Sequence, residues 1–201
     1  IAGAIALYEI TIRRYNPYLF RTGRSYGFNH QDTEDLMQET YISAYTHLAG
    51  FEGRSSFKTW LVSIMLNQCY RKKQRSGFQK EIPSEDIAKE KAMPMFTRQY
   101  AGTDQDVLNK ELAHVLENAL QQIPESYRMV FTLRELNEMN IAETAAALHI
   151  TEGNVKIRLN RAKSMLRSAI ARMYSPADIF EFNLIYCDRM VENVMKVLHE
   201  S

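Results

Sequence analysis

The stretch from residue 140 to residue 163 most constrains what this chain can fold into, because it reads as two helices joined by a very tight turn. Ile141, Ala145 and Leu148 recur at helical spacing and form the apolar stripe of a short first helix. Thr151 stands where the N-cap of a second helix is expected, and an acidic residue follows it in the first turn, where the helix dipole favours an anion. This pattern predicts a helix-turn-helix.

The second helix of this pair has two unlike sides. Its apolar stripe consists of Val155, Leu159, Ala162 and Leu166. A rotation of about 100° per residue places a polar set on the opposite side. This set contains Gly153, Ile157, Asn160, Arg161 and Ser164, and Lys156 and Arg158 flank it. An outward Asn, Arg and Lys face fits the major groove of DNA. The alternative is an ordinary helical hairpin with a solvated basic face.

The overall charge does not indicate a nucleic-acid partner, because the 201 residues carry a net charge of only +1. The distribution is more informative. Residues 1–75 and 109–175 each carry more basic than acidic groups, and the segments between and after them are acidic. Two mildly basic blocks are typical of a protein that contacts phosphate at two places.

Helical periodicity dominates the chain, so we predict an all-α fold. Glycine and proline are scarce, at 8 and 5 residues, and no convincing alternating strand pattern occurs. The periodicity is lost, and prolines appear, in a middle segment that we interpret as a flexible linker. The predicted division is a helical domain at 1–75, the linker at 76–106, a four-helix domain at 107–173 and an amphipathic helical extension at 174–201. The extension either packs against the preceding domain or docks a regulator.

The first domain contains three predicted helical segments. The first covers 5–26 as one long helix or as two shorter ones, with an interruption expected at Asn16-Pro17 because a residue before proline resists the α conformation. Asp32 or Thr33 is expected to cap the second. The third runs from Phe57 to about residue 75 and is apolar on two sides, as in helices enclosed within a bundle. The expected buried stripe of the second helix is Met37, Tyr41, Ala44 and Leu48.

Two exposed faces of this first domain are candidate binding surfaces. One face of the second helix carries Asp35, Gln38, Glu39 and Ile42, which form either a solvated surface or a partner-binding surface. The third helix leaves a narrow stripe between its apolar sides. This stripe contains Trp60, Ser63, Asn67, Tyr70, Arg71 and Gln74, and it ends in further Lys and Arg residues. Bases stack on aromatic rings and phosphates attract cations, so the stripe is a plausible single-strand surface. Core packing is an equally good reading of Trp60.

Other classes of site find little support. Cys69 and Cys187 lie far apart, as expected for reduced buried thiols in the cytosol. No cluster of residues has metal-ligand spacing, and neither a Gly-rich phosphate loop nor a nucleophile–base pair appears. No apolar run approaches the ~20 residues that span a bilayer. We therefore expect no metal, no cofactor, no enzymatic activity and no membrane insertion.

Two pairs of sequence motifs resemble those of bacterial sigma factors. DTEDLMQETYISAY followed by FEGRSSFKTWLVSIMLN is similar to sigma region 2, and LQQIPESYRMVFTLREL followed by TAAALHITEGNVKIRLNRAK resembles region 4. A short linker and the absence of other sigma regions make the chain similar to an extracytoplasmic-function (ECF) sigma factor. The resemblance covers about residues 5–173.

The resemblance implies roles for the faces described above. It assigns to core-polymerase binding the residues Asp35, Gln38, Glu39 and Ile42. It assigns to the minus-ten element, including the capture of a flipped base, Phe51, Glu52, Gly53, Arg54, Ser55, Trp60, Asn67 and Arg71. It assigns to the minus-thirty-five duplex Gly153, Asn154, Lys156, Ile157, Asn160 and Arg161. The last set largely coincides with the face derived from helical geometry.

The expected function is promoter recognition and promoter opening together with core RNA polymerase. The expected partners are core polymerase, promoter DNA as duplex and as melted non-template strand, and an anti-sigma factor. The expected location is the bacterial cytoplasm, where an anti-sigma factor can hold the protein at the membrane. The alternative is a helix-turn-helix regulator that does not bind core polymerase.

Overall fold

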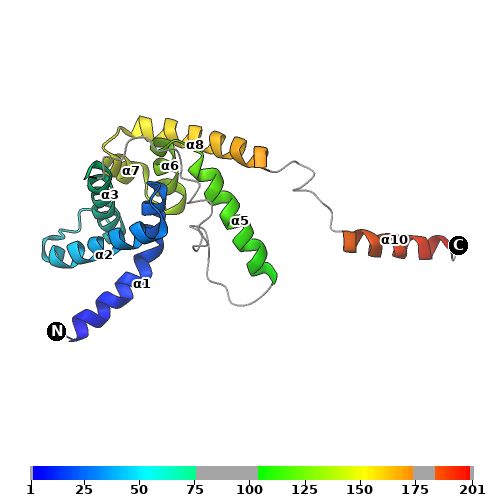
Figure 1. Ribbon diagram of the computed structural model, residues 1–201, viewed down its shortest axis with the longest axis horizontal. Helices are drawn as coiled ribbons and strands as arrows, with labels where there is room; N and C mark the ends of the chain where they lie inside the picture. The colour runs from blue at the N-terminus through cyan, green and yellow to red at the C-terminus, as the bar shows by residue number, and fades with distance from the viewer. Residues whose placement is uncertain (1, 76–103, 174–183, 200–201) are drawn as a thin grey trace.

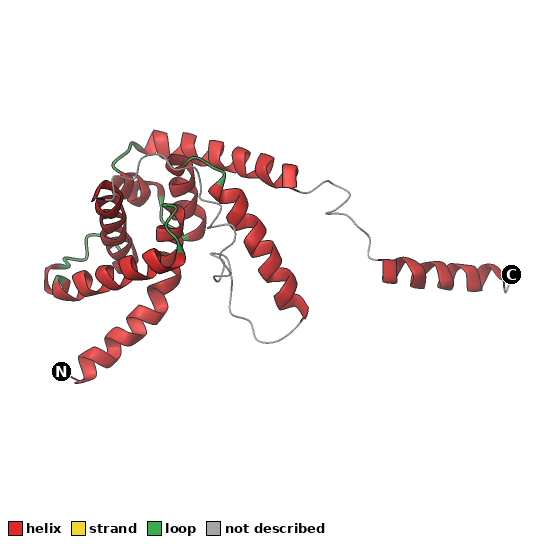
Figure 2. Cartoon of the chain, in the orientation of Figure 1, coloured by secondary structure: helices red, strands yellow, loops and turns green. Residues whose placement is uncertain are grey.

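The computed structural model describes residues 2–75, 104–173 and 184–199, and all regular structure in these ranges is helical (Figure 1 and Figure 2). The prediction of an all-α fold is confirmed. The elements are α1 (Ala2–Ser25), α2 (His30–Thr46), η1 (Leu48–Gly50), α3 (Phe57–Arg75), α5 (Asp104–Gln121), α6 (Glu125–Phe131), η2 (Thr132–Leu136), α7 (Ile141–Leu148), α8 (Glu152–Met173) and α10 (Leu184–His199). The predicted linker falls largely outside the described residues.

Helix α1 is continuous, so the interruption predicted at Asn16 and Pro17 is wrong. Pro17 lies inside the helix. Contacts on both sides of it compensate for the hydrogen bond that proline removes. On the N-terminal side the Tyr8 hydroxyl donates to the carbonyl oxygen of Tyr41, and on the C-terminal side Leu19 is fully buried. Tertiary packing therefore holds this helix together through a residue that disfavours it locally.

Helix α2 begins at His30, earlier than predicted, and its cap is neither Asp32 nor Thr33. The side chain of Asn29 accepts a hydrogen bond from the backbone N–H of Asp32 at 2.7 Å. Thr33 instead lies in the core, where its hydroxyl donates to the carbonyl oxygen of Asn29. The buried residues of the helix are Thr33, Leu36, Thr40, Tyr41 and Ala44. Two members of the predicted stripe differ, since Met37 is half-buried and Leu48 is exposed.

Helix α3 has the predicted bounds, and its two predicted apolar sides are buried except at Phe57 and Ile64, which are half-buried. The hydroxyl of Ser56 accepts from the backbone N–H of Thr59 at 3.1 Å and so satisfies a donor of the first turn. The buried side chains are Thr59, Leu61, Val62, Met65, Leu66 and Cys69. The helix is thus enclosed between neighbours on two sides, and only its remaining stripe faces outward.

The predicted helix-turn-helix is present as α7 and α8. Asn140 and Glu143 form a capping box at the start of α7. His149 then adopts a left-handed conformation with φ of 53°, which ends α7 and turns the chain. The hydroxyl of Thr151 accepts from the N–H of Asn154 at 3.2 Å, as its predicted N-cap role requires. Helix α8 ends at Met173, as predicted.

The segment before the helix-turn-helix is less regular than predicted. Apolar residues at helical spacing predict a single helix from Glu125 to about Glu138. Helix α6 instead ends at Phe131 and continues as the wide π turn η2. Glu138 has a positive φ of 54° and ends this segment. The break positions Asn137, whose side-chain amide donates to the carbonyl oxygen of Tyr18 and to the hydroxyl of Thr22, both at 3.1 Å.

The two predicted domains are packed against each other through a shared core. Met129, Leu133 and Met139, from α6 and the segment that follows it, belong to the same buried cluster as Leu19 of α1 and Leu36 of α2. Cooperative contacts of this kind are those of a single folded body. The predicted domain boundaries stay a prediction, because the sharing of a core does not locate them.

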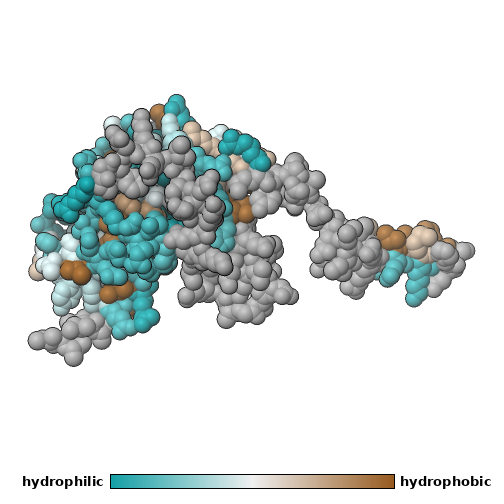
Figure 3. Space-filling model, viewed as in Figure 1, coloured by the Kyte–Doolittle hydropathy of each residue, from teal (hydrophilic) through white to brown (hydrophobic). Residues whose placement is uncertain are grey.

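Helix α10 stands apart from the helical bundle (Figure 1). Its apolar side is exposed, and Figure 3 shows these side chains gathered along the helix. The exposed residues are Met190, Val191, Val194, Met195 and Leu198. The interpretation that this extension packs on the preceding domain is therefore wrong for the described helix.

Candidate nucleic-acid interface

The polar face of α8 is a continuous exposed surface. All six residues predicted to contact the minus-thirty-five duplex are exposed: Gly153, Asn154, Lys156, Ile157, Asn160 and Arg161. Beneath them Val155 is 1% exposed and Ala162 is fully buried. The apolar stripe therefore fixes the helix, and the opposite side projects away from the protein.

Arg161 has a local positioning contact. Its Nη1 donates to the hydroxyl of Tyr127 on α6 at 3.3 Å. The neighbouring cation Lys163 forms an ion pair of 3.0 Å with Glu135. Arg161 thus keeps most of its donors available for base edges or phosphate, whereas Lys163 has an intramolecular carboxylate beside it.

Three aromatic rings meet where the 51–55 loop joins α3. The ring centroid of Phe51 lies 5.0 Å from that of Trp60 and 5.7 Å from that of Phe57. Phe57 and Trp60 are 5.5 Å apart. All three rings are half-buried, and Phe57 and Trp60 also pack against the buried core cluster. Trp60 therefore combines core packing with an accessible edge beside the loop.

The rest of the loop is open to solvent. Gly53 has φ of +70°, and a side chain added there would meet nothing within 4 Å, so the glycine is required by the turn and not by crowding. Glu52 and Arg54 form an exposed ion pair of 3.0 Å. Ser55 is half-buried. The loop thus presents polar groups beside an aromatic platform, which is the pairing of chemistries that holds an unstacked base.

Further along α3, Asn67 and Arg71 are exposed on one side of the helix. Fewer cationic side chains at the C-terminal end of α3 are available for binding than the sequence indicated. Lys72 pairs with Asp32 and Lys73 pairs with Glu125, so these ammonium groups are engaged within the protein. The cationic groups that remain exposed there include Arg71. Asn67 lines the same cavity as Arg54 and Ser55 of the 51–55 loop, and Arg71 follows Asn67 one turn later on the same face of α3.

The candidate polymerase-binding face on α2 is exposed in full. Asp35, Gln38 and Glu39 are all exposed, and Ile42 is 67% exposed although it is a large apolar residue. Asp35 accepts a hydrogen bond from Gln31 at 3.2 Å. This face therefore presents two carboxylates, an amide and one large apolar side chain to solvent.

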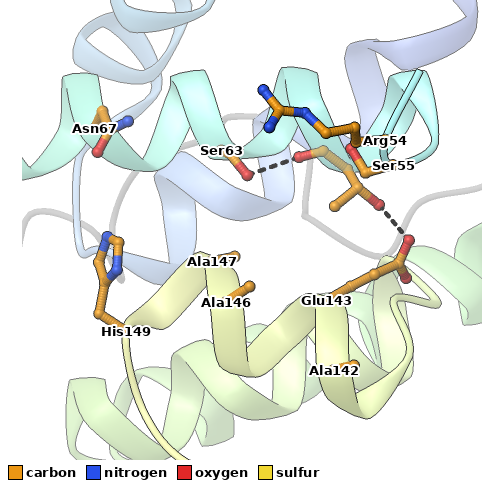
Figure 4. A pocket seen from close by; sticks show the side chains of 10 residues that line it. Arg54, Ser55, Ser63, Asn67, Ala142, Glu143, Ala146, Ala147 and His149 are labelled. Carbon is orange, nitrogen blue, oxygen red and sulfur yellow. Dashed lines mark hydrogen bonds between the residues drawn. The ribbon is translucent and has the colours of Figure 1, made fainter. Parts of the chain in front are cut away.

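A cavity that the sequence did not indicate lies between α3 and α7 (Figure 4). It has a volume of about 380 Å³, and its walls include Arg54, Asn67, Glu143 and His149. The Thr59 hydroxyl donates to Glu143 Oε1 at 2.7 Å across its floor. The lining residues within 54–67 are more than 70 positions from those within 142–149, so no local pattern relates the two groups.

Burial shifts the pKa of two groups, the guanidinium of Arg128 and the thiol of Cys69. Arg128 is 6% exposed and donates to the carbonyl oxygens of Ser25, Gln121 and Ile123. Its burial lowers the pKa of the guanidinium to about 10, although nearby Glu125 opposes the shift. Burial also raises the pKa of the Cys69 thiol. Cys69 is therefore protonated and inert at neutral pH.

The described residues contain neither a candidate metal site nor a helix that could cross a membrane. Within residues 2–75, 104–173 and 184–199, no group of three or more His, Cys, Asp and Glu side chains could hold a metal ion. In the same ranges, no helix combines the length and the apolar character needed to cross a membrane.

Comparison with known protein families gives two matches in the order expected from the motifs. Residues 11–78 match the model of Sigma-70 region 2, and residues 113–166 match that of Sigma-70, region 4. Together the two matches cover more than half of the chain. They include both candidate surfaces of the first domain and the exposed face of α8.

Curated relatives agree with this result. The ECF RNA polymerase sigma-E factor of Haemophilus influenzae is 29% identical over 143 residues, which are 69% of this chain and 75% of the relative. The sigma-E factor of Escherichia coli K12 is also 29% identical over 143 residues, covering 69% of this chain and 74% of the relative. The chain belongs to the ECF sigma factors.

Solved structures support the same fold. The sigma factor RpoE of Bartonella quintana, in complex with the anti-sigma factor NepR, aligns with a TM-score of 0.61 and 22% identity over 81% of this chain and 96% of that chain. CnrH, in complex with the cytosolic domain of CnrY, aligns with a TM-score of 0.57 and 22% identity over 85% of this chain and 92% of that chain.

Proposed function

We propose that this ECF sigma factor directs core RNA polymerase to specific promoters by using two separate surfaces for paired and unpaired DNA. The observation that carries the proposal is the full exposure of the α8 face over a buried apolar stripe, within the part of the chain that matches region 4. The region that matches region 2 carries the second, aromatic surface.

The α8 face is proposed to read the minus-thirty-five element in the major groove. Asn160 can bind adenine bidentately, and Arg161 can bind guanine in the same way. Lys156 and the N-terminal end of α8, with Gly153 and Asn154, are suited to phosphate contacts. Ile157 offers an apolar surface of the kind that packs against thymine methyl groups.

The surface formed by the 51–55 loop, Trp60, Asn67 and Arg71 is proposed to hold the melted non-template strand of the minus-ten element. Extraction of a base from the duplex costs a few kcal/mol, and an aromatic site that stacks the base recovers that cost. The protein opens DNA without chemistry, because it binds the open strand better than the duplex. No step of this proposal requires a cofactor or an enzymatic activity of the chain.

The α2 face with Asp35, Gln38, Glu39 and Ile42 is proposed to bind core polymerase. Its mixture of carboxylates, an amide and an exposed isoleucine supports a protein contact. An anti-sigma factor is a further proposed partner, since the sigma factors named in the structural comparison were solved as complexes with anti-sigma factors. A cytoplasmic location follows from a polymerase-bound role.

The decisive experiment is run-off transcription with purified core polymerase on a promoter library. We expect transcripts that start downstream of a common promoter motif, and we expect them only when this protein is present. The double variant Asp35→Ala/Glu39→Ala should lose core binding in a pull-down, whereas Glu9→Gln, which alters an exposed carboxylate of α1, should retain it. Sequence-specific DNA binding without core binding and without transcripts would overturn the proposal in favour of a polymerase-independent regulator.

A further inference from the structure

Tyr127 on α6 contacts one exposed side chain of the α8 face. Helix α6 packs against α8 in the bundle (Figure 1). The hydroxyl oxygen of Tyr127 accepts a hydrogen bond from Nη1 of Arg161 at 3.3 Å, and the two residues are 34 positions apart in the chain. A side chain from outside the recognition helix therefore holds the guanidinium that is proposed to read a base.

Packing fixes the ring of Tyr127 in place. The ring is half-buried and lies in a cluster with the buried residues Leu120 and Ile123. The same cluster includes Met165 of α8, which follows Arg161 one turn later on the same side of the helix. A tyrosine side chain turns about only a few bonds, and a packed ring cannot turn about them freely. The hydroxyl is therefore an acceptor at a defined position beside the α8 face.

The side chain of Arg161 is long and exposed, so it needs such a restraint more than a packed residue does. A long exposed side chain that becomes ordered on binding DNA loses rotamer freedom, and this loss opposes binding. A contact that exists before the DNA arrives has already removed part of that freedom. The hydrogen bond from Arg161 to Tyr127 thus favours DNA binding even where Tyr127 itself does not contact the DNA.

The atom of Arg161 that Tyr127 holds decides which donors remain for the DNA. The guanidinium is planar, and its N–H groups point outward in fixed directions. A contact at Nη1 leaves Nε–H and Nη2–H, which point in parallel along a different edge. Parallel donors of this kind match the O6 and N7 acceptors of guanine in the major groove. Tyr127 therefore uses the edge of the guanidinium that a bidentate contact with guanine does not need.

The chemistry of the holding group also suits DNA recognition, because a hydroxyl is a neutral acceptor. The neighbouring cation Lys163 is held differently, by the carboxylate of Glu135 at 3.0 Å. A carboxylate compensates the charge of its partner and competes with phosphate and base acceptors for it. Tyr127 orients Arg161 and leaves its positive charge available to the DNA.

From these contacts we propose that Tyr127 is a positioning residue for promoter recognition, which orients Arg161 so that its Nε and Nη2 donors read one guanine of the minus-thirty-five element. This inference rests on the proposed base contact of Arg161. Part of the sequence specificity of the α8 face is then determined from α6, by a residue outside the helix-turn-helix.

The test measures base discrimination by holoenzyme reconstituted from core polymerase and the full chain. The duplexes are the cognate promoter and a set in which each base pair of the minus-thirty-five element is replaced in turn. The discrimination ratio is the Kd for the replaced duplex divided by the Kd for the cognate duplex. Arg161→Ala should lower this ratio about 5- to 150-fold at one G·C pair. Tyr127→Phe keeps the ring and removes the hydroxyl, and it should lower the ratio about 2- to 10-fold at the same pair only.

The double variant Tyr127→Phe/Arg161→Ala tests whether Tyr127 acts through Arg161. It should discriminate as Arg161→Ala alone does, because the hydroxyl then has no guanidinium to orient. Additive losses would show that Tyr127 contacts the DNA itself and would overturn the positioning role. The matched control is Tyr15→Phe, which removes the hydroxyl of another half-buried tyrosine and should leave every ratio unchanged.

Two further outcomes separate the inference from the proposed function. Unchanged ratios for Arg161→Ala at every base pair would refute the proposed base contact, and the positioning role would fail with it. A loss of discrimination with Arg161→Ala but none with Tyr127→Phe would refute only the positioning role. An equal loss of affinity on all duplexes for Tyr127→Phe, together with a lower Tm, would show a purely structural role and would also overturn the proposal.

Discussion

Arg24 of α1 and Glu117 of α5 form an ion pair of 2.9 Å in which both side chains are almost fully buried. The pair joins the region that matches Sigma-70 region 2 to the region that matches region 4. Arg24 also donates to the carbonyl oxygen of Phe28 at 3.3 Å, so the charge is anchored to its own region as well.

Loss of one partner of this pair should be costly, because it leaves a charge buried without compensation. We expect Glu117→Ala to lower the free energy of unfolding by about 3–5 kcal/mol. The control is Glu9→Ala, which breaks the exposed pair with Arg13 and should cost about 0–1 kcal/mol. Urea denaturation followed by circular dichroism measures both, and equal losses would contradict the buried role of the pair.

Two helical glycines should respond in opposite ways to alanine. A Cβ at Gly23 would lie 2.7 Å from Thr33 Cγ2 and 2.9 Å from Met65 Cε, so α1 packs closely on α2 and α3 at this position. We expect Gly23→Ala to destabilise by about 1–3 kcal/mol. Gly153→Ala, on the exposed start of α8, should stabilise by up to about 1 kcal/mol. Thermal denaturation of the two variants checks the difference in sign.

The buried thiol of Cys69 should make stability depend on pH in the alkaline range. Its pKa is raised above the ordinary value of 9.0 by burial, so the native state resists deprotonation and the unfolded state does not. The contribution is complete below about pH 9 and is lost as pH rises further, by about 1.4 kcal/mol per pH unit. Denaturation of the natural chain and of Cys69→Ala at pH 8 and pH 10 measures this slope, and equal slopes would contradict it.

Arg161 and Lys163 should differ in how they affect DNA binding. Arg161→Ala should weaken binding to the cognate promoter by about 1–3 kcal/mol and relax specificity at one position, because it removes the proposed base contact. Lys163 pairs with Glu135 and is proposed to attract phosphate only, so Lys163→Ala should act uniformly across sequences. Binding assays on a panel of duplexes distinguish the two, and equal losses on every duplex for both variants would contradict the assignment.

Most of the individual helices could be predicted from the sequence, because their signals are local. The bounds of α3 and the caps of α8 follow from apolar periodicity and from the placement of Ser and Thr residues. The exposure of Asn160 and Arg161 follows from the same periodicity. The errors arise where a distant contact overrides a local preference, as at Pro17 in α1 and at the π turn that positions Asn137.

The candidate site was predicted only in part, for the same physical reason. The side chains on each helix face could be grouped from their spacing, but the approach of Glu143 to Thr59 joins residues that no periodicity relates. The engagement of Lys72 and Lys73 in ion pairs likewise depends on Asp32 and Glu125. The run of Lys and Arg residues at the end of α3 therefore predicts a larger basic surface than the folded protein presents.

The sequence contains one tryptophan, Trp60. The fold places it beside Phe51, the first residue of the 51–55 loop that is proposed to bind a base. Indole emission is sensitive to stacking and to hydration, so Trp60 gives the natural protein an intrinsic optical probe at this position. Its fluorescence can follow the arrival of a DNA strand in real time, without any label attached to the protein.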